Sequence, residues 1–226
     1  YLKKNINKID IKVKIIDDNS TDENLNKIKQ IINKSNLNIE IVNHKNDINK
    51  KIIKDQSNEE TFSNLSSLLR CFEIGKNEGK ELVFFVEDDY IHFETMLYEM
   101  LTTYERISSQ TNKELFMCPS DYPYLYMDNL KTNVLIGSKR HWRTVDKTLC
   151  TFMTSVNLIK KYWYNFNTNC IDRHDPFEKY LNEIYTREIC ISPLKSLSLH
   201  FTNVNSSYGL SPFIDYKSLW DENEIS

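Results

Sequence analysis

The stretch Leu82–Asp89, which reads LVFFVEDD, decides the fold that this sequence predicts. Five apolar residues in an unbroken run are typical of a strand that is covered on both faces of a sheet. The run ends directly in three acids, Glu87, Asp88 and Asp89. Apolar residues at helical spacing lie before and after it, so we expect a central strand between two helices.

A second acidic loop lies near the start of the sequence. Apolar and polar residues alternate over residues 9–15, which predicts a half-buried strand, and the alternation stops at the DDNS run of residues 17–20. Ser20 and Glu23 form a capping-box pattern ahead of apolar residues at helical spacing. A further strand is predicted near residues 37–42, so the order is strand, acidic loop, helix, strand.

This alternation of strands and helices favours an α/β fold. We expect a mostly parallel, Rossmann-like sheet flanked by helices. The character of the sequence changes after residue 118, which predicts one domain built from two merging halves, residues 1–118 and 119–226. In the second half, helices are predicted for residues 155–164 and 176–185.

Composition excludes several classes of protein. The net charge of -3 gives no basic footprint for nucleic acid. None of the four glycines belongs to a dinucleotide-binding or P-loop motif. The five cysteines are irregularly spaced, without CxxC pairs, so neither a zinc cluster nor a disulfide framework is predicted.

The same features indicate where the protein works. Free cysteines fit a reducing cytoplasm. No apolar run approaches the roughly 20 residues that a membrane span needs. We therefore expect a soluble cytoplasmic protein, and attachment to the inner face of the membrane stays open.

The three adjacent acids at residues 87–89 suggest a metal site. Neighbouring carboxylates repel one another, a cost that a cation or solvent offsets. Hard oxygen ligands favour Mg²⁺ or Mn²⁺, which often share the phosphates of a nucleotide. The alternative is a solvated turn whose acids favour the N-terminus of the next helix.

Two motifs resemble those of GT-A glycosyltransferases, which use nucleotide-sugar donors. Residues 83–92 (VFFVEDDYIH) resemble the DXD-type motif in an EDDY form, and residues 15–22 (IIDDNSTD) resemble the nucleotide-binding loop VVDDGSTD. Asn19 replaces the usual Gly, and Asn tolerates left-handed backbone angles. The resemblance implies the GT-A fold, and we expect this chain to lack the first strand of that fold.

The resemblance also implies roles for the acids. Asp17 and Asp18 would contact the nucleotide, with Asp17 at the base. Glu87 and Asp88 would lie near the ribose and the diphosphate. Asp89 would bind the divalent metal, Mn²⁺ or Mg²⁺, directly.

Further site residues follow from the resemblance in the second half. His200 lies where many relatives carry a metal-binding His; the alternative is an ordinary hydrogen-bonded His. Inverting relatives need a carboxylate base, for which Asp175 is the first candidate and Asp172 the second. The alternative for Asp175 is the N-cap of a helix that starts at Pro176.

Arg140 and Arg143 resemble a loop that closes over the donor, and guanidinium groups suit a diphosphate. An exposed polar loop is the alternative.

These observations predict a metal-dependent glycosyltransferase of the hexosyltransferase type, of inverting stereochemistry. It would move a sugar from a nucleotide diphosphate sugar to a glycan or glycolipid acceptor, as in polysaccharide biosynthesis. Two rivals stay open. One is a nucleotidyltransferase or phosphohydrolase that uses the same acids, and the other is a non-catalytic glycan-binding relative.

Overall fold

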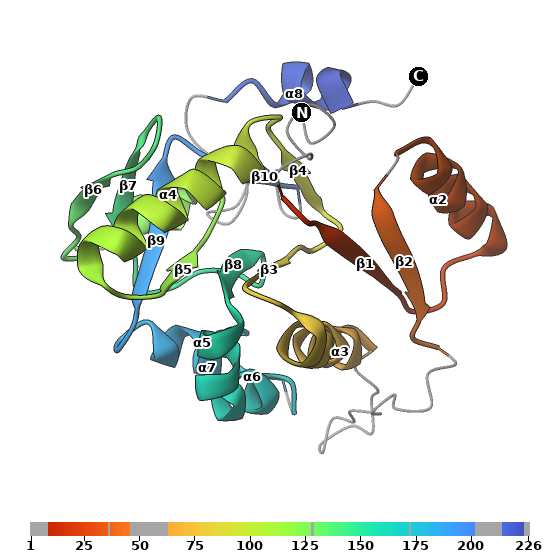
Figure 1. Ribbon diagram of the computed structural model, residues 1–226, viewed down its shortest axis with the longest axis horizontal. Coiled ribbons are helices and arrows are strands. Elements are labelled where there is room, and N and C mark those ends of the chain that lie inside the picture. Colours follow the sequence, from red (N-terminus) through yellow and green to blue (C-terminus); the bar gives the residue numbers. More distant parts are fainter. Residues whose placement is uncertain are drawn as a thin grey trace.

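A computed structural model gives the arrangement of the chain (Figure 1). It describes residues 9–35, 37–45, 63–127, 129–171, 173–201 and 214–223. The strands fall into one large sheet and two small ones. The expected absence of a strand ahead of residues 9–15 concerns residues 1–8, which lie outside the described ranges.

The large sheet has the strand order β3-β8-β5-β9-β7-β6. Its strands are β3 (Leu82–Phe85), β5 (Leu115–Met117), β6 (Val134–Ile136), β7 (His141–Thr144), β8 (Phe152–Ser155) and β9 (Ile189–Leu194). Only the β5–β9 pair is parallel, and the four other pairs are antiparallel. The prediction of a mostly parallel, Rossmann-like GT-A sheet is therefore wrong.

Two strands of the second half cause the difference. β8 inserts between β3 and β5 and runs antiparallel to both, so these two strands share a direction without being neighbours. β7 pairs antiparallel with β9 and, through a tight hairpin, with β6. Sequence patterns did not predict β6, β7 or β8, because each has only three or four residues, too few to show a period of two.

The start of the described chain follows the prediction. β1 (Lys12–Asp17) and β2 (Asn38–Asn43) form a parallel pair that is joined by α2 (Asp22–Ser35). Figure 1 shows α2 on the outer side of this pair. The predicted order of strand, acidic loop, helix and strand is confirmed.

The segment after the three acids differs from the prediction. A short strand, β4 (Tyr90–His92), comes before the helix, and it pairs antiparallel with β10 (Ser198–His200). The helix α4 (Met96–Thr111) begins only after this strand. The acids therefore lie in a short link between two strands, and do not form the N-terminal turn of a helix.

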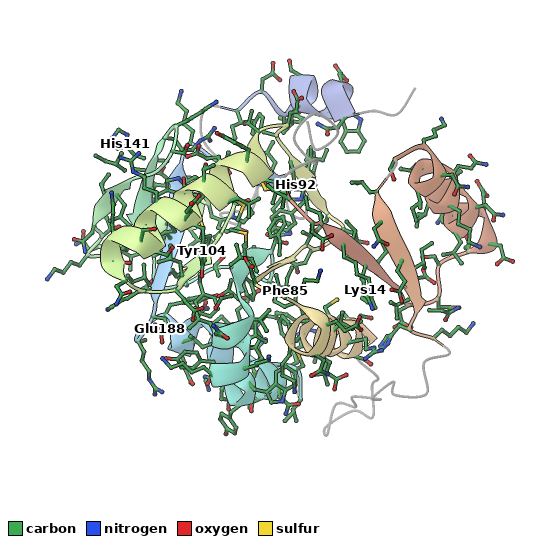
Figure 2. The ribbon with its side chains drawn as sticks, viewed as in Figure 1. Lys14, Phe85, His92, Tyr104, His141 and Glu188 are labelled. Carbon is green, nitrogen blue, oxygen red and sulfur yellow. The ribbon has the colours of Figure 1, made fainter. Side chains whose placement is uncertain are left out.

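Helices cover both faces of the large sheet. On one face lie α3 (Ser63–Glu78), α5 (Val156–Lys161), α6 (Trp163–Asn169) and α7 (Lys179–Ile184), and on the other lies α4 (Figure 1). Consecutive strand residues alternate between the two cores, as Phe116 and Met117 do. Phe85 of β3, labelled in Figure 2, packs edge-on against Phe72 of α3. Their ring centroids lie 5.0 Å apart. The predicted cover on both faces of β3 is confirmed, but β3 is the edge strand of the large sheet, so the prediction of a central strand is wrong.

The last described helix, α8 (Tyr216–Asn223), contacts β4. The predicted helix at residues 155–164 is two short helices, and the one predicted from residue 176 begins at Lys179. Among the described residues, no helix is both long and apolar enough to cross a membrane.

Candidate functional site

The link between β3 and β4 is fixed by a residue from the far half of the chain. The hydroxyl of Thr151, immediately before β8, accepts a hydrogen bond from the backbone N–H of Glu87 at 3.0 Å. The same hydroxyl lies 3.2 Å from Glu87 Oε2 and donates to it. Because β8 pairs with β3, the sheet itself holds Thr151 beside the link.

The carboxyl of Glu87 is in an unusual electrostatic environment. Its pKa is raised from the ordinary value of 4.5 to about 7. Burial is the largest cause, because it disfavours the charged form, and the negative charge of Asp89 acts in the same direction. His200 and the Thr151 hydroxyl oppose the shift. A cation beside Glu87 would favour its charged form and lower this pKa.

Asp89 and His200 lie side by side, as the resemblance implies for two metal ligands. His200 Nε2 is 3.0 Å from Asp89 Oδ2. Pairing of β4 with β10 sets this distance, and the ladder continues with the Phe201 N–H, which donates to the Asp89 carbonyl at 2.8 Å. The His200 ring stacks on Tyr90 with centroids 4.7 Å apart, which fixes its plane.

The loop after β1 has the geometry that its sequence predicts. Asn19 has a φ of 77°, so the left-handed conformation expected for the position of the usual Gly is confirmed. Asp17 is only 6% exposed, and its Oδ1 accepts a hydrogen bond from the Ser20 N–H at 3.2 Å. The loop is thus a closed turn that presents Asp18 beside it.

Helix α3 brings the two acidic loops together. The Ser67 hydroxyl donates to Asp18 Oδ2 at 3.4 Å. One helical turn further on, burial raises the pKa of the Cys71 thiol to about 11, and the charge of Glu87 contributes to the rise. Residues four apart lie on the same helix face, about 5–6 Å from each other. The loops after β1 and β3 therefore lie along the same side of α3, although β1 and β3 belong to separate sheets.

Glu178 is a further acid within electrostatic reach of Glu87 and His200, and it was not predicted from the sequence. Its pKa is raised from 4.5 to about 7, first by burial and then by the charge of Glu87, while His200 lowers it. Glu178 lies at the start of α7, in one stripe with the buried residues Leu181 and Tyr185. A carboxylate on the apolar face of a short helix was the signal that could have identified it.

The predicted bases are placed differently. Asp175 is exposed, precedes a cis peptide bond to Pro176, and makes no hydrogen bond or ion pair with any described residue. Its alternative role as N-cap is wrong, because the helix begins at Lys179 and Glu178 occupies the N-cap position. Asp172 lies outside the described residues.

The two predicted arginines make contacts within the second half. Arg143 is buried, and its Nη2 lies 2.5 Å from Asp121 Oδ1, in an ion pair. Arg140 donates from Nη1 to the carbonyl oxygens of Lys195 and Ser196, at 2.7 and 3.2 Å. No contact among the described residues joins either guanidinium to the three acids of the link.

The fit of a divalent metal can be judged from the pair Asp89 and His200. In an octahedral site with bonds of about 2.1 Å, neighbouring ligand atoms lie about 3 Å apart, which matches the Nε2 to Oδ2 distance. Within the described residues, no three His, Cys, Asp or Glu side chains form a metal-binding group. The pair therefore fits an ion of the Mg²⁺ type, which usually takes its other ligands from water and substrate phosphates.

Comparison with protein-family models gives no match, and comparison with curated protein sequences gives none either. The function is therefore argued from the geometry and electrostatics of the site.

Proposed function

We propose that this protein transfers a sugar from a nucleotide diphosphate sugar to a glycan or glycolipid acceptor, in a reaction that depends on a divalent metal ion. The observation that carries the proposal is the 3.0 Å pair of Asp89 and His200, next to the partly buried carboxyl of Glu87. The pair would bind the metal ion and the diphosphate of the donor, and the closed turn at Asp17 would bind its nucleotide.

Asp89 and His200 would hold Mn²⁺ or Mg²⁺. When bound, the ion would neutralise the diphosphate that leaves from the donor. The acids Glu87 and Asp88 line the same link, where they would orient the diphosphate end. The nucleotide would lie toward α3, where Asp17 and Asp18 mark the end of β1.

Glu178 is the proposed general base. A pKa of about 7 leaves a large share of this carboxyl ionised at neutral pH, and basic enough to take a proton. The acceptor hydroxyl would give its proton to Glu178 while its oxygen bonds to the anomeric carbon. The bond from that carbon to the diphosphate oxygen would break at the same time, which inverts the configuration. This assignment replaces Asp175, which is exposed.

Arg140 and Arg143 have no part in this proposal, because the structure gives both guanidinium groups other partners. The proposed place of work is the cytoplasm, at the inner face of a membrane where a glycolipid acceptor would be present. The net charge of -3 supports no nucleic-acid substrate.

A screen of nucleotide diphosphate sugars tests the proposal. A ligand that binds only the folded protein raises its apparent stability, so the correct donor should raise the unfolding temperature in the presence of Mn²⁺. The same donor is then incubated with candidate acceptors, and the products are identified by mass spectrometry.

Transfer of the sugar to an acceptor supports the proposal. Three results would contradict it: release of nucleoside monophosphate from the donor, which indicates a phosphohydrolase or nucleotidyltransferase; binding of glycans without turnover; or no stabilisation by any nucleotide sugar.

A further inference from the structure

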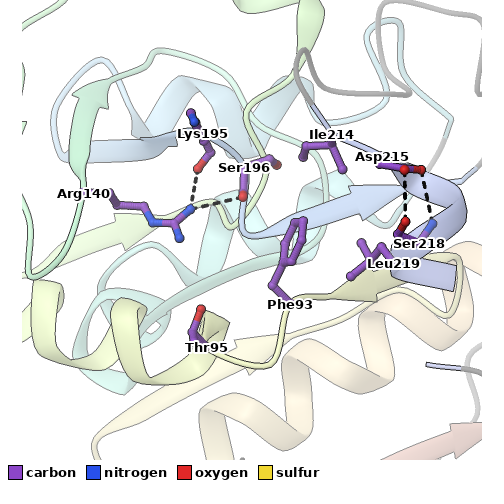
Figure 3. Close-up of a pocket in the computed structure, with 9 residues that line it drawn as sticks. All are labelled: Phe93, Thr95, Arg140, Lys195, Ser196, Ile214, Asp215, Ser218 and Leu219. Atoms are coloured by element: carbon purple, nitrogen blue, oxygen red, sulfur yellow. Dashed lines mark hydrogen bonds between the residues drawn. The ribbon is translucent and has the colours of Figure 1, made fainter. Parts of the chain in front are cut away.

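A pocket lies away from the acids of the candidate active site (Figure 3). Its volume is about 360 Å³, within the range of small-ligand sites (Figure 3). Arg140 and Lys195 line one end, and Asp215 and Leu219 line the other, with Phe93 between them. The wall thus combines the β6–β7 hairpin, the β9–β10 turn and α8.

The ladder of β4 and β10 separates this pocket from the candidate active site. At one end of the ladder, the Phe201 N–H donates to the Asp89 carbonyl. At the other end, the Phe93 N–H donates to the Leu197 carbonyl at 3.0 Å. Four extended residues span about 13 Å, so the pocket lies roughly that far from the pair of Asp89 and His200.

The guanidinium of Arg140 is fixed in place but only partly used. Its Nη1 bonds to two carbonyl oxygens, which holds the group rigid. Among the described residues, neither Nε nor Nη2 of Arg140 has a hydrogen-bond partner, and Nε is buried. Because Nε is enclosed by the protein, a ligand in the pocket would bind this guanidinium through Nη2. Lys195 adds a second positive charge that makes no described ion pair.

Two acids lie in this region, Glu99 within electrostatic reach of Arg140 and Asp215 at the opposite end of the pocket. Glu99, whose charge reaches Arg140, accepts hydrogen bonds from the Lys139 N–H, the Thr103 hydroxyl and the Trp142 ring N–H. Asp215 caps α8 through the N–H groups of its first turn. Among the described residues, no ion pair joins either carboxylate to Arg140 or Lys195, and the two Arg140 hydrogen bonds go to backbone carbonyls.

Two more features fit an anion at this end. The Thr95 hydroxyl lines the pocket at the N-terminus of α4 and makes no capping hydrogen bond. The positive end of the α4 dipole lies at the same place. The apolar side chains of Phe93 and Leu219 line the part of the pocket away from the cations (Figure 3).

We propose that this pocket binds a small ligand with a terminal oxyanion, a phosphate monoester or a carboxylate, and an apolar body. The oxyanion accepts hydrogen bonds from Arg140 and forms an ion pair with Lys195. The apolar body packs against Phe93 and Leu219. This site is separate from the acids of the proposed active site and does not depend on the proposed function.

Calorimetric titration of the full chain with phenyl phosphate tests the site, with benzoate as the carboxylate probe and phenol as the uncharged control. We expect one bound phenyl phosphate per chain and no measurable binding of phenol. Arg140→Gln should weaken binding about tenfold or more, as expected for a lost charge-assisted hydrogen bond, and Arg140→Lys should restore part of it. Lys195→Gln, an exposed change, should weaken binding about threefold.

Matched variants locate the ligand. Lys139→Gln removes a neighbouring positive charge that lies over Tyr98 and outside the pocket, so affinity should stay unchanged. Asp89→Asn should also leave it unchanged. The proposal is overturned if neither phenyl phosphate nor benzoate binds, if Arg140→Gln and Lys195→Gln both bind like wild type, or if Asp89→Asn abolishes binding. Unfolding temperatures of all variants verify that each is folded.

Discussion

The two acidic loops look alike in the sequence, but their structures are determined differently. The loop after β1 is a local turn, closed by the Asp17 and Ser20 hydrogen bond and by the left-handed Asn19. The link after β3 takes its geometry from distant residues, because Thr151 bonds Glu87 and His200 pairs with Asp89. A short motif can therefore predict the first loop completely, and only the fold as a whole explains the second.

The largest expected effect concerns Glu178, the acid within electrostatic reach of Glu87 in the second loop. Replacing Glu178 with Gln should lower the rate of sugar transfer roughly 100- to 10,000-fold, because a general base is lost, while donor affinity changes little. Because the pKa of Glu178 is about 7, the wild-type rate should rise as pH increases through about 7. Steady-state kinetics over a pH series provide both measurements.

The control is Asp175→Asn, an exposed carboxylate of the same segment, which should keep nearly the full rate. If Asp175→Asn is the inactive variant and Glu178→Gln is active, the assignment of the base is reversed.

The next effect tests the first loop. Asp17→Ala should weaken nucleotide binding about tenfold even without metal, because a charge-assisted hydrogen bond to the base is removed. Titration of the nucleotide in the presence of a chelator measures it. The exposed acid Glu105, changed to Gln on α4, serves as control. Equal affinity of Asp17→Ala and wild type would give Asp17 a purely structural role in its turn.

A smaller effect concerns stability and pH in the second loop. Glu87 has a raised pKa in the folded state, so its neutral form stabilises the protein fully below pH 4.5. This contribution decreases as pH rises and is lost above about 7. Glu87→Gln cannot ionise, so it should unfold about 2–4 °C above wild type at pH 8 and show no such gain at pH 4.

Thermal unfolding in metal-free buffer at the two pH values makes the measurement. A gain of the same size at both pH values would mean that ionisation of Glu87 is not its source.

The smallest effect returns to the first loop. Asn19→Ala should destabilise the protein by about 1 kcal/mol, because Ala tolerates a φ of 77° poorly. Asn19→Gly should be neutral or slightly stabilising, since Gly adopts positive φ freely. Chemical denaturation of the two variants compares them directly, and an unchanged stability of Asn19→Ala would show that the turn relaxes without cost.

The same contrast explains what the sequence could predict. Local patterns were sufficient for β1, α2 and β2, and for the double cover of β3, because each shows its own period or an unbroken apolar run. The mostly antiparallel arrangement of the strands in the large sheet was not predictable in this way. It depends on β8, a strand of four residues whose partners are far away in the sequence. Phe152 of β8 pairs with Phe85 of β3, 67 positions earlier, and Met153 pairs with Met117 of β5, 36 positions earlier.

For the site, the motif positions led to Asp89 and His200, which the structure brings together. Glu178 was missed because its importance comes from burial next to Glu87, which spacing along the chain does not reveal. The division into halves at residue 118 stays a prediction, although β8 and β9 of the second half pair with β3 and β5 of the first.

The most direct test of the account is calorimetric titration of nucleoside diphosphate into wild type and Asp89→Asn, each with and without Mn²⁺. A neutral amide cannot replace a carboxylate at a hard cation, so Asp89→Asn should lose the metal-dependent part of the affinity and keep the metal-independent part, with the fold intact. The same dependence on Mn²⁺ in both proteins would contradict the assignment of Asp89 as the metal ligand.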